Sequence, residues 1–295
     1  MNLNETELLR GVRLQKVEQC PICGTTERLP YDLQDDPGRL IRGVQCANCA
    51  LVYMDAFVDS ADLARFYSGY HQDRTGDNAA LAAKRQQMYV LDAEYAMRFV
   101  GGGHQSLLDV GCGAGDFLAH FPDELGRYGI EIDSLALRLG QKLYPSVTFF
   151  SSPEQAAQTV PGAFDVVIFR GTLQYMPDLS VISAFVRSHI RPGGRILLLA
   201  TPNADSLLAR VQREDWGLYN SIEHRYCFGI KQLQRLFGNE FHLLDYALPY
   251  LGTPYENYLN DLDKVCTLLK NGEGASRKQS IPFFGSMMNV VFERI

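Results

Sequence analysis

Hydrophobic and polar positions along the chain form two recurring patterns, short apolar runs and longer segments with an apolar stripe. Short apolar runs bounded by turn residues predict buried strands, and stripes at helical spacing predict amphipathic helices. Strands are predicted at residues 106–110, 128–132, 147–150, 164–169 and 195–200. Helices are predicted at residues 117–121, 134–143, 153–158, 179–190 and 230–237. This alternation predicts an α/β fold in which a mostly parallel sheet carries helices on both faces.

The last part of the chain breaks this alternation. Two more strands are predicted at 241–246 and 288–292, and between them lies an excursion, 249–286, with a helix predicted at 256–269. Because no helix pattern lies tightly between the two strands, we expect an antiparallel final strand. The excursion either shapes a substrate pocket or supports a dimer. The sequence leaves the oligomeric state open, a homodimer included.

The first part of the chain also differs from the middle. An amphipathic helix is predicted at 79–100, where a glycine run ends it. Residues 59–78 predict a short helix and a polar connector, and residues 1–58 contain clustered cysteines and only short predicted strands. We therefore expect a small N-terminal unit over 1–58, a connector over 59–78 and a main domain over 79–295.

The stretch LLDVGCGAGDFL places three alternate glycines, Gly111, Gly113 and Gly115, directly after a predicted buried strand. Glycines in such a turn adopt positive φ and lack Cβ atoms, so the backbone can lie directly against a ligand. The spacing is not the G-x-G-x-x-G of dinucleotide sites. Asp109 and Asp116 flank the loop, and two carboxylates repel a pyrophosphate but attract a ligand with an ammonium and a sulfonium group. The loop therefore predicts a site for S-adenosylmethionine.

An acidic residue after the next strand completes a nucleoside site. The strand YGIEID reaches Glu131, the position at which an acid accepts hydrogen bonds from both ribose hydroxyls. Asp133, two residues later, is interpreted as a helix-start residue.

These segments, together with FDVVIFRGTLQYMPD and IRPGGRILLLATPN, resemble the successive motifs of class I S-adenosylmethionine-dependent methyltransferases from about residue 80 to the end. The resemblance implies a Rossmann-like sheet. It also implies that the cofactor contacts Asp109, Gly111, Cys112, Gly113, Gly115, Glu131, Ile132, Ser152, Arg170 and Gly171.

Within that set, the resemblance assigns different parts of the cofactor to different residues. Asp109 and the glycine loop hold the methionine part, Glu131 holds the ribose, and the segment 170–171 lines the methionine end. Ser152 stands in the region where many relatives bind the adenine amine with an aspartate. Cys112 is interpreted as a small buried residue and not a nucleophile, because no basic residue is near it in sequence.

Four cysteines, Cys20, Cys23, Cys46 and Cys49, form the pattern C-x2-C-x22-C-x2-C. This spacing is close to that of a tetrahedral Zn²⁺ site built from two tight turns, and the alternative is a pair of redox CxxC motifs. Four thiolates leave no open position on the ion, so we expect this zinc to fold the N-terminal unit rather than to catalyse a reaction.

The segments CPICGT, VQCANCALVYMD and LARFYSGYHQD resemble a subgroup of class I methyltransferases with an N-terminal four-cysteine zinc ribbon. That resemblance implies small acceptors, often deoxysugars, polysaccharide units or natural products. Tyr67 and Tyr70 then either fold over the cofactor or acceptor, or pack the connector on the main domain.

The segment 203–230 follows the fifth predicted strand and has the composition of a lid, with the single tryptophan Trp216. Its stretch SIEHRYCFG resembles a Glu-His-aromatic pattern of the same subgroup, which makes His224 the preferred general base. The alternative is that His224 only ties the segment down. Tyr175 is the second candidate for the base.

Composition and charge narrow the function classes. The 295 residues carry a net charge of −6, and residues 1–58 contain six Lys/Arg against eight Asp/Glu, which disfavours a nucleic-acid partner. The start of the chain lacks the pattern of a secretory signal, and no run approaches the ~20 apolar residues of a membrane span. Together with the resemblance, this favours a cytoplasmic methyltransferase of a small molecule that acts on a hydroxyl, with N- and C-methylation as alternatives. The other functions left open are an rRNA or tRNA methyltransferase that binds RNA through its ribbon, and a non-catalytic protein that binds S-adenosylmethionine and a partner.

Overall fold

The structure is a computed structural model. It describes residues 9, 11–33, 39–59, 61–63, 79–100, 106–160, 164–220, 222–253, 255–271 and 279–295. Ser60, Tyr67 and Tyr70, and with them most of the predicted connector, lie outside the described residues.

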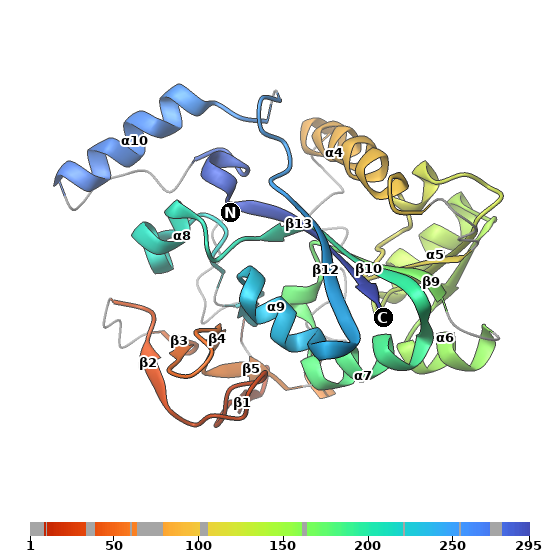
Figure 1. Cartoon of the computed structure of the whole chain (residues 1–295), viewed down its shortest axis with the longest axis horizontal. Helices are drawn as coiled ribbons and strands as arrows, with labels where there is room; N and C mark the ends of the chain where they lie inside the picture. Colours follow the sequence, from red (N-terminus) through yellow and green to blue (C-terminus); the bar gives the residue numbers. More distant parts are fainter. Residues whose placement is uncertain are drawn as a thin grey trace.

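A seven-stranded sheet forms the centre of the main domain, in the order β12-β13-β10-β9-β6-β7-β8 (Figure 1). Its strands are β6 (Ser106–Val110), β7 (Gly126–Ile130), β8 (Val147–Phe150), β9 (Phe164–Arg170), β10 (Ile190–Pro202), β12 (Phe241–Ala247) and β13 (Met287–Arg294). The strands β6 to β10 pair in parallel, and β13 pairs antiparallel with both β10 and β12. The α/β class and the antiparallel final strand are confirmed.

Helices cover both faces of this sheet, as predicted. They are α4 (Ala79–Met97), α5 (Ser134–Leu143), α6 (Pro153–Thr159), α7 (Leu179–His189) and α9 (Ile230–Phe237). Neighbouring residues of a strand point to opposite faces. Leu107 and Leu197 accordingly share a buried cluster with α4 and α5, whereas Leu108 and Leu198 share another with α6, α7 and α9.

The helix predicted at 117–121 is wrong in extent, because the chain forms only a 3₁₀ turn at Leu118–His120. Gly115 has a φ of +88°, and Pro122 follows directly after Phe121, which is extended. A residue before proline is pushed out of the helical region, so the segment between Gly115 and Pro122 is too short for a helix. Phe117 and Leu118 are nevertheless buried, which fixes the glycine loop onto the core.

The N-terminal unit contains a two-stranded sheet, β1 with β5, and a four-stranded sheet of order β11-β4-β3-β2. The strands are β1 (Leu14–Lys16), β2 (Arg28–Pro30), β3 (Gly43–Cys46), β4 (Val52–Met54), β5 (Ala56–Val58) and β11 (Tyr226–Cys227). The strand β11 comes from the main domain, so the two units share one sheet.

The segment 203–230, predicted as a lid, packs against both the N-terminal unit and the excursion. It contains α8 (Leu207–Gln212) and β11, and Trp216 is buried in a cluster with Val265 of α10 (Tyr258–Asn271) and with Phe283. The excursion therefore packs on this segment instead of standing free. No described helix combines the length and the apolar character that crossing a membrane requires.

Candidate active site

The glycine loop between β6 and the 3₁₀ turn has the backbone that its sequence predicts. Gly111, Gly113 and Gly115 have φ values of +79°, +57° and +88°. A Cβ atom at Gly111 would lie 2.7 Å from Cγ2 of Thr172, and one at Gly115 would lie 2.8 Å from the Phe149 ring. Two of the three positions therefore exclude a side chain by contact as well as by conformation.

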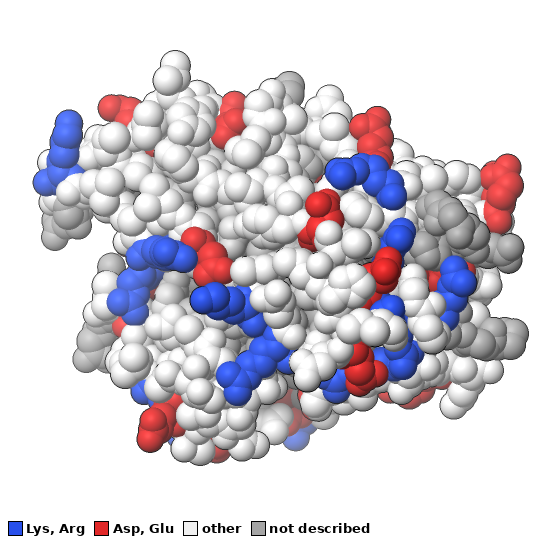
Figure 2. Space-filling model, in the orientation of Figure 1, with Lys and Arg blue, Asp and Glu red and all other residues white. Residues whose placement is uncertain are grey.

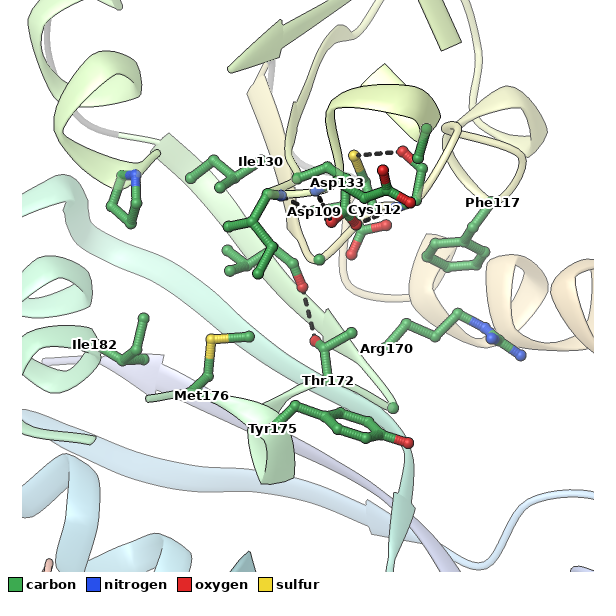
Figure 3. A pocket seen from close by; sticks show the side chains of 18 of the residues that line it. Asp109, Cys112, Phe117, Ile130, Asp133, Arg170, Thr172, Tyr175, Met176 and Ile182 are labelled. Atoms are coloured by element: carbon green, nitrogen blue, oxygen red, sulfur yellow. Dashed lines mark hydrogen bonds between the residues drawn. The ribbon is translucent and has the colours of Figure 1, made fainter. Parts of the chain in front are cut away.

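A cavity of about 440 Å³ lies over this loop, at the carboxyl ends of β6, β7 and β9 (Figure 3). The predicted residues that line it are Asp109, Gly111, Cys112, Gly113, Glu131, Ile132, Arg170, Gly171 and Tyr175. Three predicted site residues, Gly115, Ser152 and His224, lie outside its lining. The crevice at the carboxyl ends of parallel strands is where α/β sheets bind nucleotide-like ligands.

The Asp109 carboxylate is the strongest electrostatic feature of the cavity. Its side chain is buried, and no hydrogen-bond partner reaches Oδ1 among the described residues. The pKa of Asp109 is raised to about 7, because the effect of burial, to which the nearby Glu131 adds, outweighs the opposing effect of Arg170. A buried carboxylate without a partner is costly, so this position favours a cationic ligand group.

Glu131 holds the loop together. One of its carboxylate oxygens accepts a hydrogen bond from the amide of Gly113 at 2.9 Å, and the other accepts from the amides of Ile132 and Asp133 at 2.7 and 2.9 Å. Asp133 caps α5 by accepting from the amide of Leu135, as expected of a helix-start residue. The acid at the end of β7 therefore has a structural role in addition to the one predicted for it.

Arg170 at the end of β9 is held in place by Asp92 of α4. Its Nε donates to Oδ2 of Asp92 at 2.8 Å, and the Tyr250 hydroxyl donates to the same oxygen at 2.6 Å. The guanidinium lies over the Tyr89 ring, 4.3 Å from its centroid. Through this ion pair with Asp92, Arg170 fixes α4 against the cavity as well as lining it.

The far end of the cavity differs from the prediction. Ser152 caps α6, its hydroxyl accepting from the amide of Gln155 at 3.2 Å. The lining there comes from Pro153 and Glu154, and a hydrogen bond from Ser152 lowers the pKa of Glu154. Glu154 is thus the acidic side chain next to the predicted adenine position.

Tyr175 and His224 form a pair on one side of the cavity. Nε2 of His224 is hydrogen-bonded to the Tyr175 hydroxyl at 3.0 Å, and the two rings meet edge to face with their centroids 4.9 Å apart. Tyr175 lines the cavity, whereas His224 is buried behind it. The two candidates for the general base are therefore a connected pair.

Sequence reasoning missed several residues of the site. Arg85, Tyr89 and Asp92 all lie on α4. In the sequence they are ordinary members of an amphipathic helix, and nothing in the pattern marks them as site residues. Thr172 follows the fourth predicted strand, and its hydroxyl donates to the carbonyl of Val110 at 2.7 Å. Such contacts depend on which elements meet, which periodicity does not specify.

The four cysteines converge as their spacing predicts. Their sulfur atoms all lie within 4.8 Å of one another, with 3.5 Å between those of Cys20 and Cys49 and 3.4 Å between those of Cys23 and Cys46. Zn–S bonds of ~2.3 Å in a tetrahedron place sulfurs about 3.8 Å apart, so the four thiols fit one Zn²⁺ ion.

Comparison with known proteins agrees with this geometry. Residues 70–240, more than half of the chain, match the family described as "Methyltransferase domain". The chain belongs to this family. The fold also resembles a chain in a solved structure, the complex between the Haloferax volcanii Trm112 methyltransferase activator and the putative methyltransferase. The two chains superpose with a TM-score of 0.51 over 72% of this chain and 94% of that one, and their sequences are 13% identical. That likeness confirms the class I methyltransferase fold alone.

Two curated relatives of this methyltransferase-domain protein are similar over somewhat less than half of it. A ubiquinone biosynthesis O-methyltransferase of Albidiferax ferrireducens is 32% identical over 146 residues, which are 46% of this chain and 56% of that protein. A trans-aconitate 2-methyltransferase of Deinococcus radiodurans is 28% identical over 141 residues, 46% of this chain and 49% of that protein. The chain thus spans about half the length of the curated relatives it matches.

Proposed function

We propose that this protein transfers a methyl group from S-adenosylmethionine to a hydroxyl of a small molecule, such as a sugar or natural product. The observation that carries the proposal is the buried Asp109 carboxylate, which faces a cavity on a glycine loop and has no hydrogen-bond partner among the described residues. The family of the chain and the names of its two curated relatives, both small-molecule methyltransferases, support it.

In this proposal each part of the cavity holds one part of the cofactor. Asp109 and the glycine loop hold the cationic methionine part, Glu131 accepts from the ribose, and Glu154 lies at the adenine end in place of Ser152. When bound, S-adenosylmethionine supplies an electrophilic methyl group on a good leaving group. The chain's own contribution is then to hold acceptor and donor in line and to exclude water.

Tyr175 and His224 are proposed to move the acceptor's proton. Tyr175 lines the cavity, so its hydroxyl is the group that contacts the acceptor. As the acceptor oxygen bonds to the methyl carbon and the carbon–sulfur bond breaks, Tyr175 takes the acceptor's proton and its own phenolic proton passes to His224 along their 3.0 Å hydrogen bond. His224 therefore acts as the base through Tyr175.

The cysteine cluster is proposed to hold a structural Zn²⁺ ion in the N-terminal unit, residues 1–58. The two turns that carry the cysteines are alike: the amide of Gly24 donates to the carbonyl of Cys20 at 2.9 Å, and that of Ala50 donates to Cys46 at 3.0 Å. Both of these residues adopt positive φ. Thiols kept reduced for a metal fit a cytoplasmic protein.

The test is to incubate the purified protein with methyl-labelled S-adenosylmethionine and fractionated host extract. Label in the small-molecule fraction supports the proposal. RNase-sensitive label in the macromolecular fraction would overturn it and favour an RNA methyltransferase. On the face drawn in Figure 2, acidic as well as basic side chains occur over the N-terminal unit, which agrees with a small acceptor rather than a phosphate backbone.

A further inference from the structure

One sheet joins the N-terminal unit, residues 1–58, to the segment that carries His224 of the candidate catalytic pair. The N-terminal unit is called the cysteine unit below. The strand β4 follows directly after the second cysteine turn, where the amide of Cys46 donates to the carbonyl of Leu51 at 2.9 Å. β4 pairs antiparallel with β11, Tyr226 lying opposite Tyr53 and Cys227 opposite Val52. His224 stands two residues before β11, so the strand that begins just after the second cysteine turn also fixes the segment with the proposed base.

Arg225, next to His224, binds both units. Its guanidinium donates to the carbonyl of Val58 at 2.8 Å and lies over the Phe57 ring, 4.6 Å from the centroid. Its carbonyl accepts from the amide of Met54 at 3.1 Å, and its own amide donates to the carbonyl of Gln174 at 2.8 Å. Arg225 is therefore hydrogen-bonded both to the cysteine unit and to Gln174, the residue next to Tyr175.

A second contact joins the other end of this segment to the cysteine cluster. The side-chain amide of Gln232 donates to the carbonyl of Cys49 at 2.8 Å, while its oxygen accepts from the amide of Gly229 at 3.0 Å and so caps α9. A metal ligand's own backbone thus holds the start of α9. The segment 224–232 is attached to the cysteine unit at both ends.

We propose that the metal-bound cysteine unit positions the His224–Tyr175 pair, with Arg225 and Gln232 as the positioning residues. This inference rests on the proposed function, since it takes the cysteines to hold Zn²⁺ and the pair to carry the proton. The unit then acts as a support of the active site built into the fold rather than as a docking module. Loss of the metal frees β4, and with it the segment that orients His224.

The test uses the full chain in four forms: wild type, wild type stripped of metal, Arg225→Met and Arg225→Lys. The matched control is Arg213→Met, because Arg213 also joins the two units, donating to the carbonyl of Pro30 at 2.9 Å, but does not touch the segment 224–232. Two readouts need no acceptor: amide hydrogen exchange over 224–228, and the ¹⁵N resonances of the His224 ring, assigned by their loss in His224→Gln.

We expect metal removal and Arg225→Met to speed exchange over 224–228 and to shift the His224 resonances and their pH midpoint. Affinity for S-adenosylmethionine should stay within about twofold, while kcat for an identified acceptor falls about ten- to a hundredfold, the cost of misplaced groups. Arg225→Lys should restore part of the loss, and Arg213→Met should change none of these readouts. If Arg225→Met does not fold, Gln232→Met takes its place.

Unchanged exchange and unchanged His224 resonances after metal removal would overturn the inference. An equal effect of Arg213→Met would also overturn it, because any loss of contact between the two units would then disturb His224 and no specific positioning by Arg225 would be needed. Metal analysis that finds no metal in the purified protein would do the same. Failure of the proposed function has a different outcome, no binding of S-adenosylmethionine and no label transfer, and it leaves the exchange and resonance measurements interpretable.

Discussion

Among single residues, the charged side chains at the strand ends were the part of the site that the sequence predicted best. Asp109 and Glu131 were predicted from their places at the ends of two strands, and both lie at the cavity. Arg170 was also predicted, but its partner Asp92 was not, because a buried acid on an amphipathic helix looks like any polar residue in the sequence. Ser152 was predicted as a ligand contact; it caps α6, a role typical of serine, and lies outside the lining of the cavity.

The raised pKa of Asp109 predicts how cofactor binding depends on pH. A cation at Asp109 favours the ionised form, so affinity for S-adenosylmethionine should rise as pH increases from 5.5 to 7.5, by up to about tenfold per unit below the pKa near 7. Calorimetric titrations across this range measure it. Asp109→Asn should bind more weakly at pH 7.5 and show a flat profile; the same slope in the variant would exclude Asp109 as its source.

The same pKa has the opposite consequence for the ligand-free protein. Because the folded-state pKa of Asp109 lies above its unfolded value, its contribution to stability is fully present below the unfolded pKa and is lost as pH rises through about 7. Urea titrations should therefore show that Asp109→Asn gains unfolding free energy relative to wild type as pH rises from 5 to 8. A constant difference over that range would contradict a perturbed Asp109.

The pair of Tyr175 and His224 is predicted to affect turnover and not the binding of S-adenosylmethionine. Tyr175→Phe removes the hydroxyl that joins the two side chains, and His224→Gln removes the final proton acceptor. Each should lower kcat by about 10²- to 10⁴-fold and leave the affinity for S-adenosylmethionine within a few-fold. The double variant should be little worse than either single one, since the two act as one unit. Additive losses would show that the residues act separately.

At the scale of elements, the sequence predicts the strands better than their order. The short apolar runs predicted the observed bounds of β6 and β8. β6 is a central strand that is buried along almost its whole length, whereas β8 is an edge strand on which Thr148 is exposed. The insertion of β13 between β10 and β12 and the pairing of β11 with β4 are not readable from periodicity. The helix predicted at 117–121 failed because Gly115 and Pro122 leave no room for it.

The glycine loop allows an element-scale test of close packing. Gly111→Ala should destabilise the protein by about 2 to 4 kcal/mol, since it combines an unfavourable positive φ with the 2.7 Å approach to Thr172. Gly193→Ala is the control, with a φ of +73° but nothing within 4 Å. Urea titrations should show the smaller loss there, and Thr172→Ser should recover part of the Gly111→Ala loss. Equal losses at both glycines would remove the packing argument.

At the scale of the whole molecule, the N-terminal unit and the methyltransferase domain fold as interlocked parts. A shared four-stranded sheet and side-chain hydrogen bonds join the two sides of the boundary predicted at residue 58. The four-cysteine site was predictable because ligand spacing is local, whereas its link to His224 was not, because it depends on tertiary contacts.

Metal removal tests this interlocking. If Zn²⁺ folds the N-terminal unit, stripping it with a chelator should lower the melting temperature and release one ion per chain, because metal affinity is part of the folding free energy. Cys46→Ser should behave as the stripped wild type does, and adding Zn²⁺ should restore the wild type only. A melting temperature that does not change with metal content would contradict a structural ion.

Every step proposed above requires that the cavity over the glycine loop binds S-adenosylmethionine, and calorimetric titration of the purified full chain measures this binding. We expect one site per chain with a dissociation constant of about 1 µM to 1 mM, the range typical of enzymes for their substrates. We also expect strongly weakened binding in Asp109→Asn at pH 7.5. Absence of binding by the folded wild type, or binding that Asp109→Asn leaves unchanged, would contradict the proposal.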